Sequence, residues 1–97
     1  MRKSIVVDPD VMKCAVCGRR SPLQWHHIIH GTANRLMSDR YGCTCWLCMS
    51  CHDHLHNDPA PYWRDIDEQL KQAAQRQFEN IYSREKWMEI FKKNYCD

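Results

Sequence analysis

The sequence predicts a small domain of the α+β class, with a cysteine- and histidine-rich first part and a helical second part. Three observations support this: two strand-like runs, a 3.6-residue apolar period near the C-terminus, and two Cys-x2-Cys pairs that one metal ion could join. The length of 97 residues fits one domain. A chain this short buries a limited core, so a metal site is an expected source of additional stability.

Residues 14–58 are expected to form the core of the domain around two short strands and one helix. The run LQWHHII at 23–29 is rich in strand-forming residues, and residues 43–47 are a second strand candidate. The intervening residues 30–42 are polar, contain two glycines and have few periodic apolar positions, so we expect a loop. A short helix is expected over 49–57, and the two prolines that follow would end it.

The secondary structure of the two ends of the chain is predicted from local residue patterns. Residues 4–7, within the leading segment 1–13, could form an edge strand. Residues 62–97 are expected to be a helical extension, with Ser83 as the N-cap of its second helix and Glu85 in the first turn. The positions expected on the packed faces of the two helices, with Gln77 as the one polar exception, are Ile66, Leu70, Ala73, Ala74, Gln77, Phe78 and Ile81, then Trp87, Ile90 and Phe91.

The composition bears on the compartment and on possible partners. The N-terminal MRKSIVVDPD lacks the long apolar run of a signal peptide, and no stretch reaches the ~20 residues of a membrane span. We therefore expect a cytoplasmic protein with reduced thiols, in which paired cysteines indicate metal ligands rather than disulfides. The formal net charge is only +2, a weak signature of nucleic-acid binding. Zinc-bound thiolates would leave the remaining surface more basic than this charge indicates.

Four of the seven cysteines have the spacing of a structural metal site. Cys14, Cys17, Cys48 and Cys51 form the pattern Cys-x2-Cys-x30-Cys-x2-Cys, which is typical of a closed tetrahedral zinc site. The glycine after the second cysteine permits the tight turn that such a site requires.

The other three cysteines have less defined expectations. Cys43 and Cys45 would lie on the same face of a strand and are expected to pack as small apolar groups. Because they form a Cys-x-Cys pair, one of them could instead replace a sulfur of the zinc site. Cys96, near the C-terminus, is expected to take no part in the site.

All six histidines lie between residues 26 and 56. His26 and His27 are neighbours on the first predicted strand, so they face opposite sides unless the strand bends. His52 and His56 share one face of the predicted helix, whereas His54 lies nearer the opposite face and is expected to face solvent. That helix starts at the predicted zinc site. The strand and the helix can therefore bring histidines to one point, which predicts a second, open metal site.

The whole pattern resembles the HNH endonucleases of the ββα-metal class. It implies a zinc-stapled ββα-metal (HNH) core with C-terminal helices, and its matching residues span 14–57: Cys14, Cys17, His26, His27, Ile28, Leu47, Cys48, Cys51, His52 and His56. The stretch GTANRLMSDRYG and the tail ending in FKKNYC are similar to small phage HNH proteins, which are grouped with RecA-dependent recombination-enhancement nucleases.

The resemblance implies a role for each histidine of the pattern. His27 matches the general base that activates water, and His26 and His52 match ligands of the catalytic divalent cation. His56 matches a second helix residue that contacts the cation or the phosphate. The expected cation is Mg²⁺ or Mn²⁺, although an imidazole-rich site also suits Ni²⁺ or Zn²⁺. His30 has no counterpart in the family and could line the active-site loop.

The sequence departs from the family at the central asparagine. Cys43 stands where that residue is usual, and Asn34 is nine residues upstream. In the family this asparagine braces the loop after the first strand. Asn34 with Arg35 could do the same, Arg35 could bind phosphate, or Asn34 could be an ordinary loop residue.

The predicted function is a metal-dependent DNA endonuclease that hydrolyses phosphodiester bonds in phage or prophage recombination or DNA processing, inside a bacterial host. DNA and a RecA-type recombinase filament are the expected partners, a membrane is not, and the oligomeric state stays open. An alternative is a non-catalytic zinc module that binds DNA or a recombinase. Candidate phosphate contacts, which could also be scattered solvated charges, are Arg19, Arg20, Arg35 and Arg40.

Overall fold

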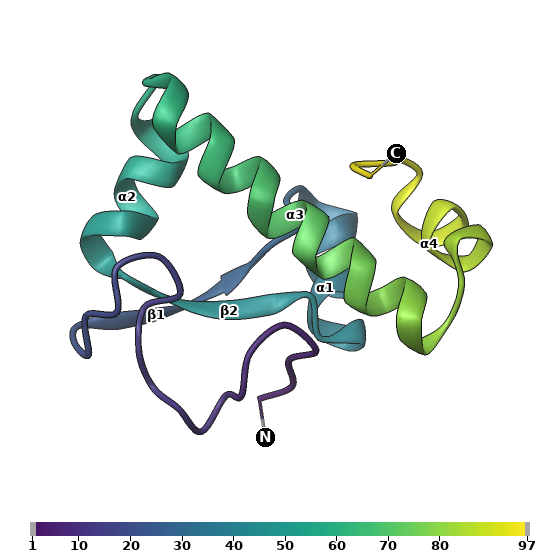
Figure 1. The fold of residues 1–97 in the computed structure, drawn as a ribbon, viewed down its shortest axis with the longest axis horizontal. Helices are drawn as coiled ribbons and strands as arrows, with labels where there is room; N and C mark the ends of the chain where they lie inside the picture. Colours follow the sequence, from purple (N-terminus) through teal and green to yellow (C-terminus); the bar gives the residue numbers. More distant parts are fainter. Residues whose placement is uncertain (1, 97) are drawn as a thin grey trace.

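The computed structural model describes residues 2–96, which form four helices and one two-stranded antiparallel sheet. The α+β class predicted from the sequence is confirmed. No helix within this part of the chain is long and apolar enough to cross a membrane. Figure 1 shows the order of the elements: β1 (Leu23–His27), α1 (Thr32–Tyr41), β2 (Thr44–Cys48), α2 (Met49–Asn57), α3 (Pro61–Ile81) and α4 (Arg84–Phe91).

The sheet pairs β1 with β2 so that Trp25 lies opposite Trp46, with ring centroids 4.8 Å apart. Both strands are at the predicted places with shifted ends. β1 stops at His27, and the two isoleucines after it are almost completely buried in the core. β2 is buried at all five positions and leads directly into α2, whose bounds agree with the prediction.

The loop predicted over 30–42 is wrong, because Thr32–Tyr41 forms the helix α1. The helix is polar, so the 3.6-residue apolar period that indicates most helices is weak here. Its bounds are set by two glycines with positive φ, Gly31 (97°) and Gly42 (76°). The amide of Gly42 donates to the carbonyl of Ser38 and ends the helix in a left-handed cap.

The strand predicted over 4–7 is also wrong within the described residues, where residues 5–7 form a bend. The hydroxyl of Ser4 accepts hydrogen bonds from the amides of Val6 and Val7, both at 3.1 Å, and so turns the chain away from the sheet. The same hydroxyl donates to the carbonyl of Thr44 at 2.6 Å, which holds the segment against β2.

The two C-terminal helices confirm the predicted extension. Ser83 caps α4, since its hydroxyl accepts a hydrogen bond from the amide of Lys86 at 3.0 Å. Phe78 of α3 and Trp87 of α4 are fully buried and pack edge to face, with ring centroids 5.4 Å apart. Ile81, expected on the apolar face, is 54% exposed because the helix ends there.

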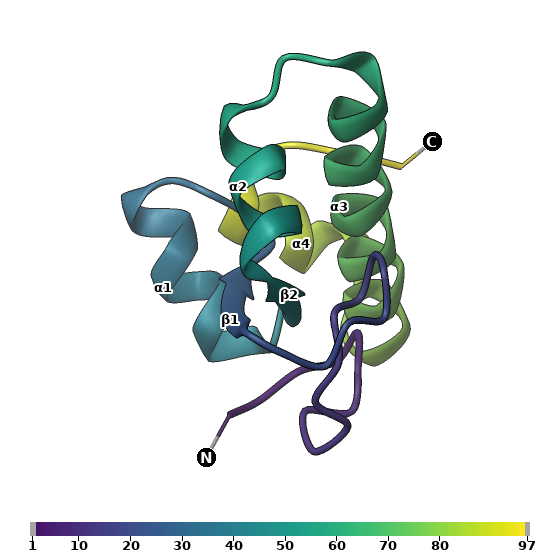
Figure 2. The same ribbon diagram turned by 90° about the vertical axis from the view of Figure 1, so that its left-hand side faces the viewer.

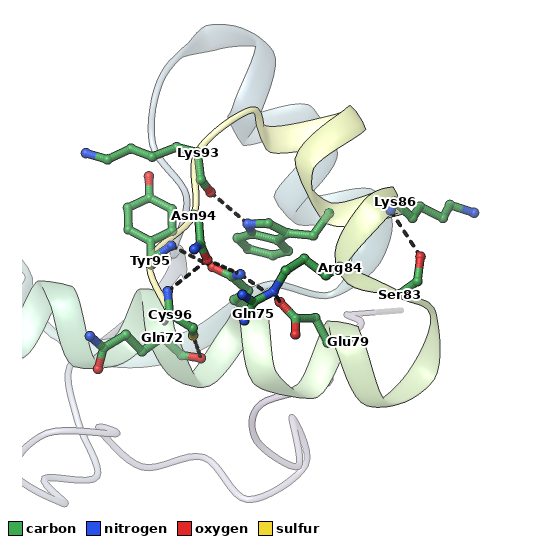
Figure 3. Close-up of polar contacts among 11 residues, drawn as sticks. Gln72, Gln75, Glu79, Ser83, Arg84, Lys86, Lys93, Asn94, Tyr95 and Cys96 are labelled. Carbon is green, nitrogen blue, oxygen red and sulfur yellow. Dashed lines mark hydrogen bonds and ion pairs between the residues drawn. The ribbon is translucent and has the colours of Figure 1, made fainter.

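The C-terminal tail returns to α3 and is held by Gln75, which is fully buried (Figure 3). Its amide nitrogen donates to Glu79 and to Asn94, and its amide oxygen accepts from the backbone of Tyr95, all at 2.7 Å. A buried amide with this many partners is satisfied. This network therefore fixes the tail across α3.

Helices α2 and α3 lie side by side, α2 packs against both strands, and α1 contacts β1 and α4 (Figure 2). The chain turns between these two helices after Asn57, and Pro61 occupies the first turn of α3, where its missing amide costs nothing. One face of α3 is thereby brought next to the histidines of α2 and of the segment after β1.

Candidate functional site

The four cysteines of the two Cys-x2-Cys pairs meet in the structure. One ligand atom from each of Cys14, Cys17, Cys48 and Cys51 lies within 4.8 Å of all the others. The Sγ atoms of Cys17 and Cys48 are 3.7 Å apart. Two sulfurs at the usual 2.3 Å from one tetrahedral zinc are separated by about 3.8 Å, so this cluster has the dimensions to hold a metal ion.

Backbone amides point at two of these sulfurs. The amides of Val16 and Cys17 donate to Sγ of Cys14, at 3.4 and 3.5 Å. The amide of Cys51 donates to Sγ of Cys48 at 3.4 Å. Burial raises the pKa of the Cys14 thiol, but hydrogen bonds, led by that from the Cys17 amide, outweigh it and bring the pKa to about 6. The Cys14 sulfur thus favours the thiolate, which is the form that binds metal, whereas burial and hydrogen bonds with the neighbouring thiols raise the pKa of Cys51.

The remaining cysteines lie outside this cluster. Cys43 and Cys45 are fully buried, and burial raises the pKa of each thiol to about 12. They pack as apolar groups, as predicted, and neither replaces a sulfur of the four-cysteine set. Cys96 lies at the tail, where its thiol donates to the carbonyl of Gln72 at 3.6 Å.

A second cluster consists of imidazoles from β1 and α2. Ligand atoms of His26, His52 and His56 all lie within 4.8 Å of one another. The Nε2 atoms of His52 and His56 are 3.2 Å apart. Two nitrogens bound at about 2.1 Å to a common ion are separated by about 3.0–3.4 Å, so this spacing also fits a metal ion.

His26 is the buried member of the histidine cluster, with 1% of its surface exposed. Its Nε2 atom is buried and has no hydrogen-bond partner among residues 2–96. Burial, followed by the nearby His30, His52 and His56, lowers the pKa of His26 to about 3. The ring is therefore neutral at neutral pH, and its Nε2 atom makes no hydrogen bond. Burying such a polar atom costs free energy, and a cation bound to Nε2 would offset that cost.

The same effects act on the two histidines of α2. Burial lowers the pKa of His52, with further lowering from His56 and His30. Burial and then His30 lower the pKa of His56. Neutral imidazoles are metal ligands, so this cluster can bind a divalent cation without first losing protons at neutral pH.

An open cleft of about 950 Å³ lies beside the histidine cluster, between β1, α1 and α2. His27 lines it and faces α1, where its Nε2 atom is 3.4 Å from a carboxylate oxygen of Asp39. His26 and His27 thus face different neighbours, as expected for adjacent residues of a strand, yet both reach this cleft.

His30 also lines the cleft, and it contacts a residue that sequence reasoning missed. Its Nε2 atom is 3.0 Å from Oδ1 of Asp67 on α3, and Lys71 donates to Oδ2 of the same carboxylate at 2.7 Å. Burial raises the pKa of Asp67, but the hydrogen bonds from His30 and Lys71 hold it below its ordinary value. The sequence offers only the Asp67–Lys71 spacing, which is common on exposed helix faces.

The candidate arginines do not all gather at the cleft. Arg35, on α1, lines it and is exposed. Arg19 and Arg20 are exposed next to the first Cys-x2-Cys turn, and Arg40 is exposed at the end of α1. Only Arg35 is therefore placed to contact a phosphate in the cleft itself, and contacts by the others stay a prediction.

The segment after β1 is braced by Ser38 rather than by Asn34. The buried hydroxyl of Ser38 donates to the carbonyl of Ile29 at 3.0 Å and accepts from its amide at 3.2 Å. Asn34 is a half-buried helical residue, so the expectation of a loop residue at this position is wrong.

His54 is exposed, as predicted. It packs flat on Trp63 at 5.0 Å between centroids and pairs with Asp58 at 2.9 Å, away from the histidine cluster.

No family model, no curated protein and no solved structure matches the chain.

Proposed function

We propose that the protein is a metal-dependent DNA endonuclease of the HNH type. The observation that carries the proposal is the arrangement of four of the five imidazoles that line one open cleft. Three of them, from His26, His52 and His56, have the spacing of cation ligands. The fourth, His27, lies across the cleft beside a carboxylate and is free to act as a base.

The two clusters have separate tasks in this proposal. The cysteine cluster holds a zinc ion that fixes the first turn, β2 and the start of α2 relative to one another. Cys48 is the N-cap of α2 and Cys51 lies in its first turn, so zinc there sets the position of the histidines farther along the helix. A closed set of four sulfurs leaves no position for a substrate, whereas the histidine cluster faces the cleft.

The chemistry of phosphodiester hydrolysis assigns a task to each side chain of the cleft. The imidazole of His27 accepts a proton from the attacking water, and the carboxylate of Asp39, 3.4 Å away, stabilises the imidazolium that forms. A divalent cation held by His26, His52 and His56 would stabilise the charge on the phosphate and on the leaving 3′ oxygen. Arg35 binds a neighbouring phosphate of the DNA and orients the scissile bond.

The partner of the reaction is DNA, and a RecA-type recombinase filament would present that DNA. The cleft is open, as binding of a polymer requires, and it carries one exposed arginine, which is little charge for tight binding. A partner that concentrates and orients the DNA would compensate for this weak contact.

Nicking of supercoiled plasmid tests the proposal. The zinc-containing protein is assayed with Mg²⁺, Mn²⁺, Ni²⁺ or Zn²⁺, with excess chelator, and with or without recombinase filaments on the DNA. We expect cleavage that requires the added cation. The variant His27→Ala should lose at least about 100-fold in rate, because general-base catalysis contributes about 10²–10⁴-fold.

The matched control is His54→Ala, which removes an exposed imidazole from the far side of α2. It should cleave at the wild-type rate. Bound zinc and DNA affinity are measured for every variant, so that a folding defect is recognised. If the wild type binds DNA but does not cleave it under any of these conditions, the protein is a binding module and the proposal is wrong.

A further inference from the structure

His30 occupies a position in the histidine cluster that neither the spacing of the motif nor the proposed mechanism explains. It follows β1 in the chain and lines the cleft with 35% of its side chain exposed. Its ring centroid is 5.1 Å from that of His26 and 5.0 Å from that of His56. These separations fall within the range of the three-histidine set, where centroids lie between 4.5 and 5.6 Å apart.

The four rings form a diamond rather than a row. His26 and His56 are the shared pair, 5.6 Å apart between centroids, and each contacts both of the other two rings. His52 and His30 therefore occupy the two outer corners. A cation seated between His26 and His56 would have an imidazole on either side of it. The unpartnered Nε2 atom of the buried His26 is the independent sign that this cluster accepts a ligand.

Asp67 controls which nitrogen of His30 is available. Its Oδ1 atom is 3.0 Å from Nε2 of His30, and its Oδ2 atom accepts from Lys71. A carboxylate accepts hydrogen bonds, so Nε2 carries the proton and Nδ1 carries the free lone pair. One ligand atom from each of His26, His30 and Asp67 also lies within 4.8 Å of the others, but both oxygens of Asp67 already have partners, so we assign Asp67 as a positioning group and not as a ligand. Metal-binding histidines commonly have such a carboxylate on the second nitrogen.

We propose that His30 is a fourth imidazole ligand of the cation and that Asp67, from the helical extension, is the positioning residue that orients it. This inference rests on the cation site of the proposed function and deepens it. Four imidazoles make the site one for Mn²⁺, Co²⁺, Ni²⁺ or Zn²⁺ rather than Mg²⁺, which prefers oxygen ligands and keeps its water. Helix α3 thereby becomes part of the active centre.

Titration of the zinc-containing protein with Co²⁺ tests this inference without any cleavage assay. The visible absorption of Co²⁺ reports the number and type of its ligands, and bands from sulfur ligands would reveal entry into the cysteine cluster. We expect one Co²⁺ per chain at the histidine site. His30→Ala should weaken it by about 100-fold and change the spectrum, and Asp67→Asn should weaken it by about 10-fold, within the range for outer partners of metal ligands.

Two matched control variants distinguish these effects from a non-specific effect of substitution on folding. Glu68→Gln removes an exposed carboxylate next to Asp67 on the same helix, and His54→Ala removes an imidazole outside the cluster. Both should bind Co²⁺ like the wild type. Zinc content and helicity are measured for all variants, and His30→Gln, which keeps a polar side chain of similar size, serves as a second variant if His30→Ala fails to fold.

The outcomes distinguish this inference from the proposed function. Loss of Co²⁺ binding in His26→Ala with an unchanged affinity and spectrum in both His30 variants would overturn the fourth ligand and leave the three-histidine site standing. Two Co²⁺ ions per chain, one of them lost in His30→Ala, would overturn it as well. Absence of Co²⁺ binding in the wild type would overturn both.

Discussion

The cysteine cluster and the histidine cluster have similar distances between their ligand atoms, but the first is mostly buried and the second borders an open cleft. In each, ligand atoms within 4.8 Å of one another come from segments distant in the sequence. Three of the four cysteines are buried, and backbone amides donate to two of the sulfurs. The histidines border an open cleft, and one buried ring nitrogen has no partner within the described part of the chain.

Under the proposed function, this difference would let a small chain separate folding from chemistry. Helix α2 connects the clusters: Cys48 and Cys51 lie at its start, and His52 and His56 follow on its next turns. A metal in the first cluster would orient the helix without occupying the cleft. The second cluster can then remain accessible, because it is not required to hold the fold together. Each of the following predictions tests that separation.

The largest effect is expected from removing zinc. Exhaustive chelation, or the double substitution Cys14→Ser with Cys48→Ser, should abolish the cooperative fold, because structural zinc supplies about 10–16 kcal/mol in zinc-finger peptides. Far-ultraviolet circular dichroism and thermal melting measure the loss. Cys96→Ser, at the tail outside the cluster, is the control and should melt like the wild type. A chain that stays helical and melts cooperatively without zinc would contradict the assignment.

The substitution His52→Ala should lower stability less than zinc removal does, but it should strongly weaken cation binding. Loss of a half-exposed ligand should weaken binding at the histidine cluster by about 100-fold, or about 2.7 kcal/mol, while zinc stays bound to the cysteines. Calorimetric titration with Mn²⁺ and zinc analysis measure the two sites separately. If this variant lost its zinc or unfolded, the two clusters would not be independent.

The third prediction concerns the wall of the cleft formed by α1. Ser38→Ala leaves the buried amide and carbonyl of Ile29 without their hydroxyl partner and should cost about 1–3 kcal/mol of unfolding free energy. Urea denaturation measures it, with Ser50→Ala at an exposed position of α2 as the control. Zinc content should be unchanged, and a wild-type stability would show that the hydroxyl does not hold the segment after β1.

The smallest effect is expected at the first cysteine turn. Gly18 has φ of 79°, and an added Cβ would meet nothing within 4 Å, so Gly18→Ala should cost only the conformational penalty of about 1–2 kcal/mol. Zinc affinity should fall modestly, and cation binding by the histidines should not change. A marked loss of cation affinity would mean that strain in the cysteine cluster reaches the cleft.

Sequence reasoning succeeded where a local pattern carries the information. The spacing of the cysteines, the histidines four residues apart on α2 and the cap at Ser83 were identified correctly, because each depends on the geometry of a single turn or helix. It failed for α1, whose polar residues obscure the helical period, and for residues 4–7, where a hydroxyl competes with strand pairing.

The amino-acid sequence by itself determined the ligand types, their local spacing and the class of the fold, since these follow from residue chemistry and from the periods of helices and strands. Only the tertiary structure decided that His30 lies beside His56 of α2, that it contacts Asp67 on α3, and that Arg35 alone of the four candidate arginines lines the cleft. Such contacts join residues distant along the chain. They depend on how the helices pack against one another, and no periodic pattern of residues in the sequence indicates that packing.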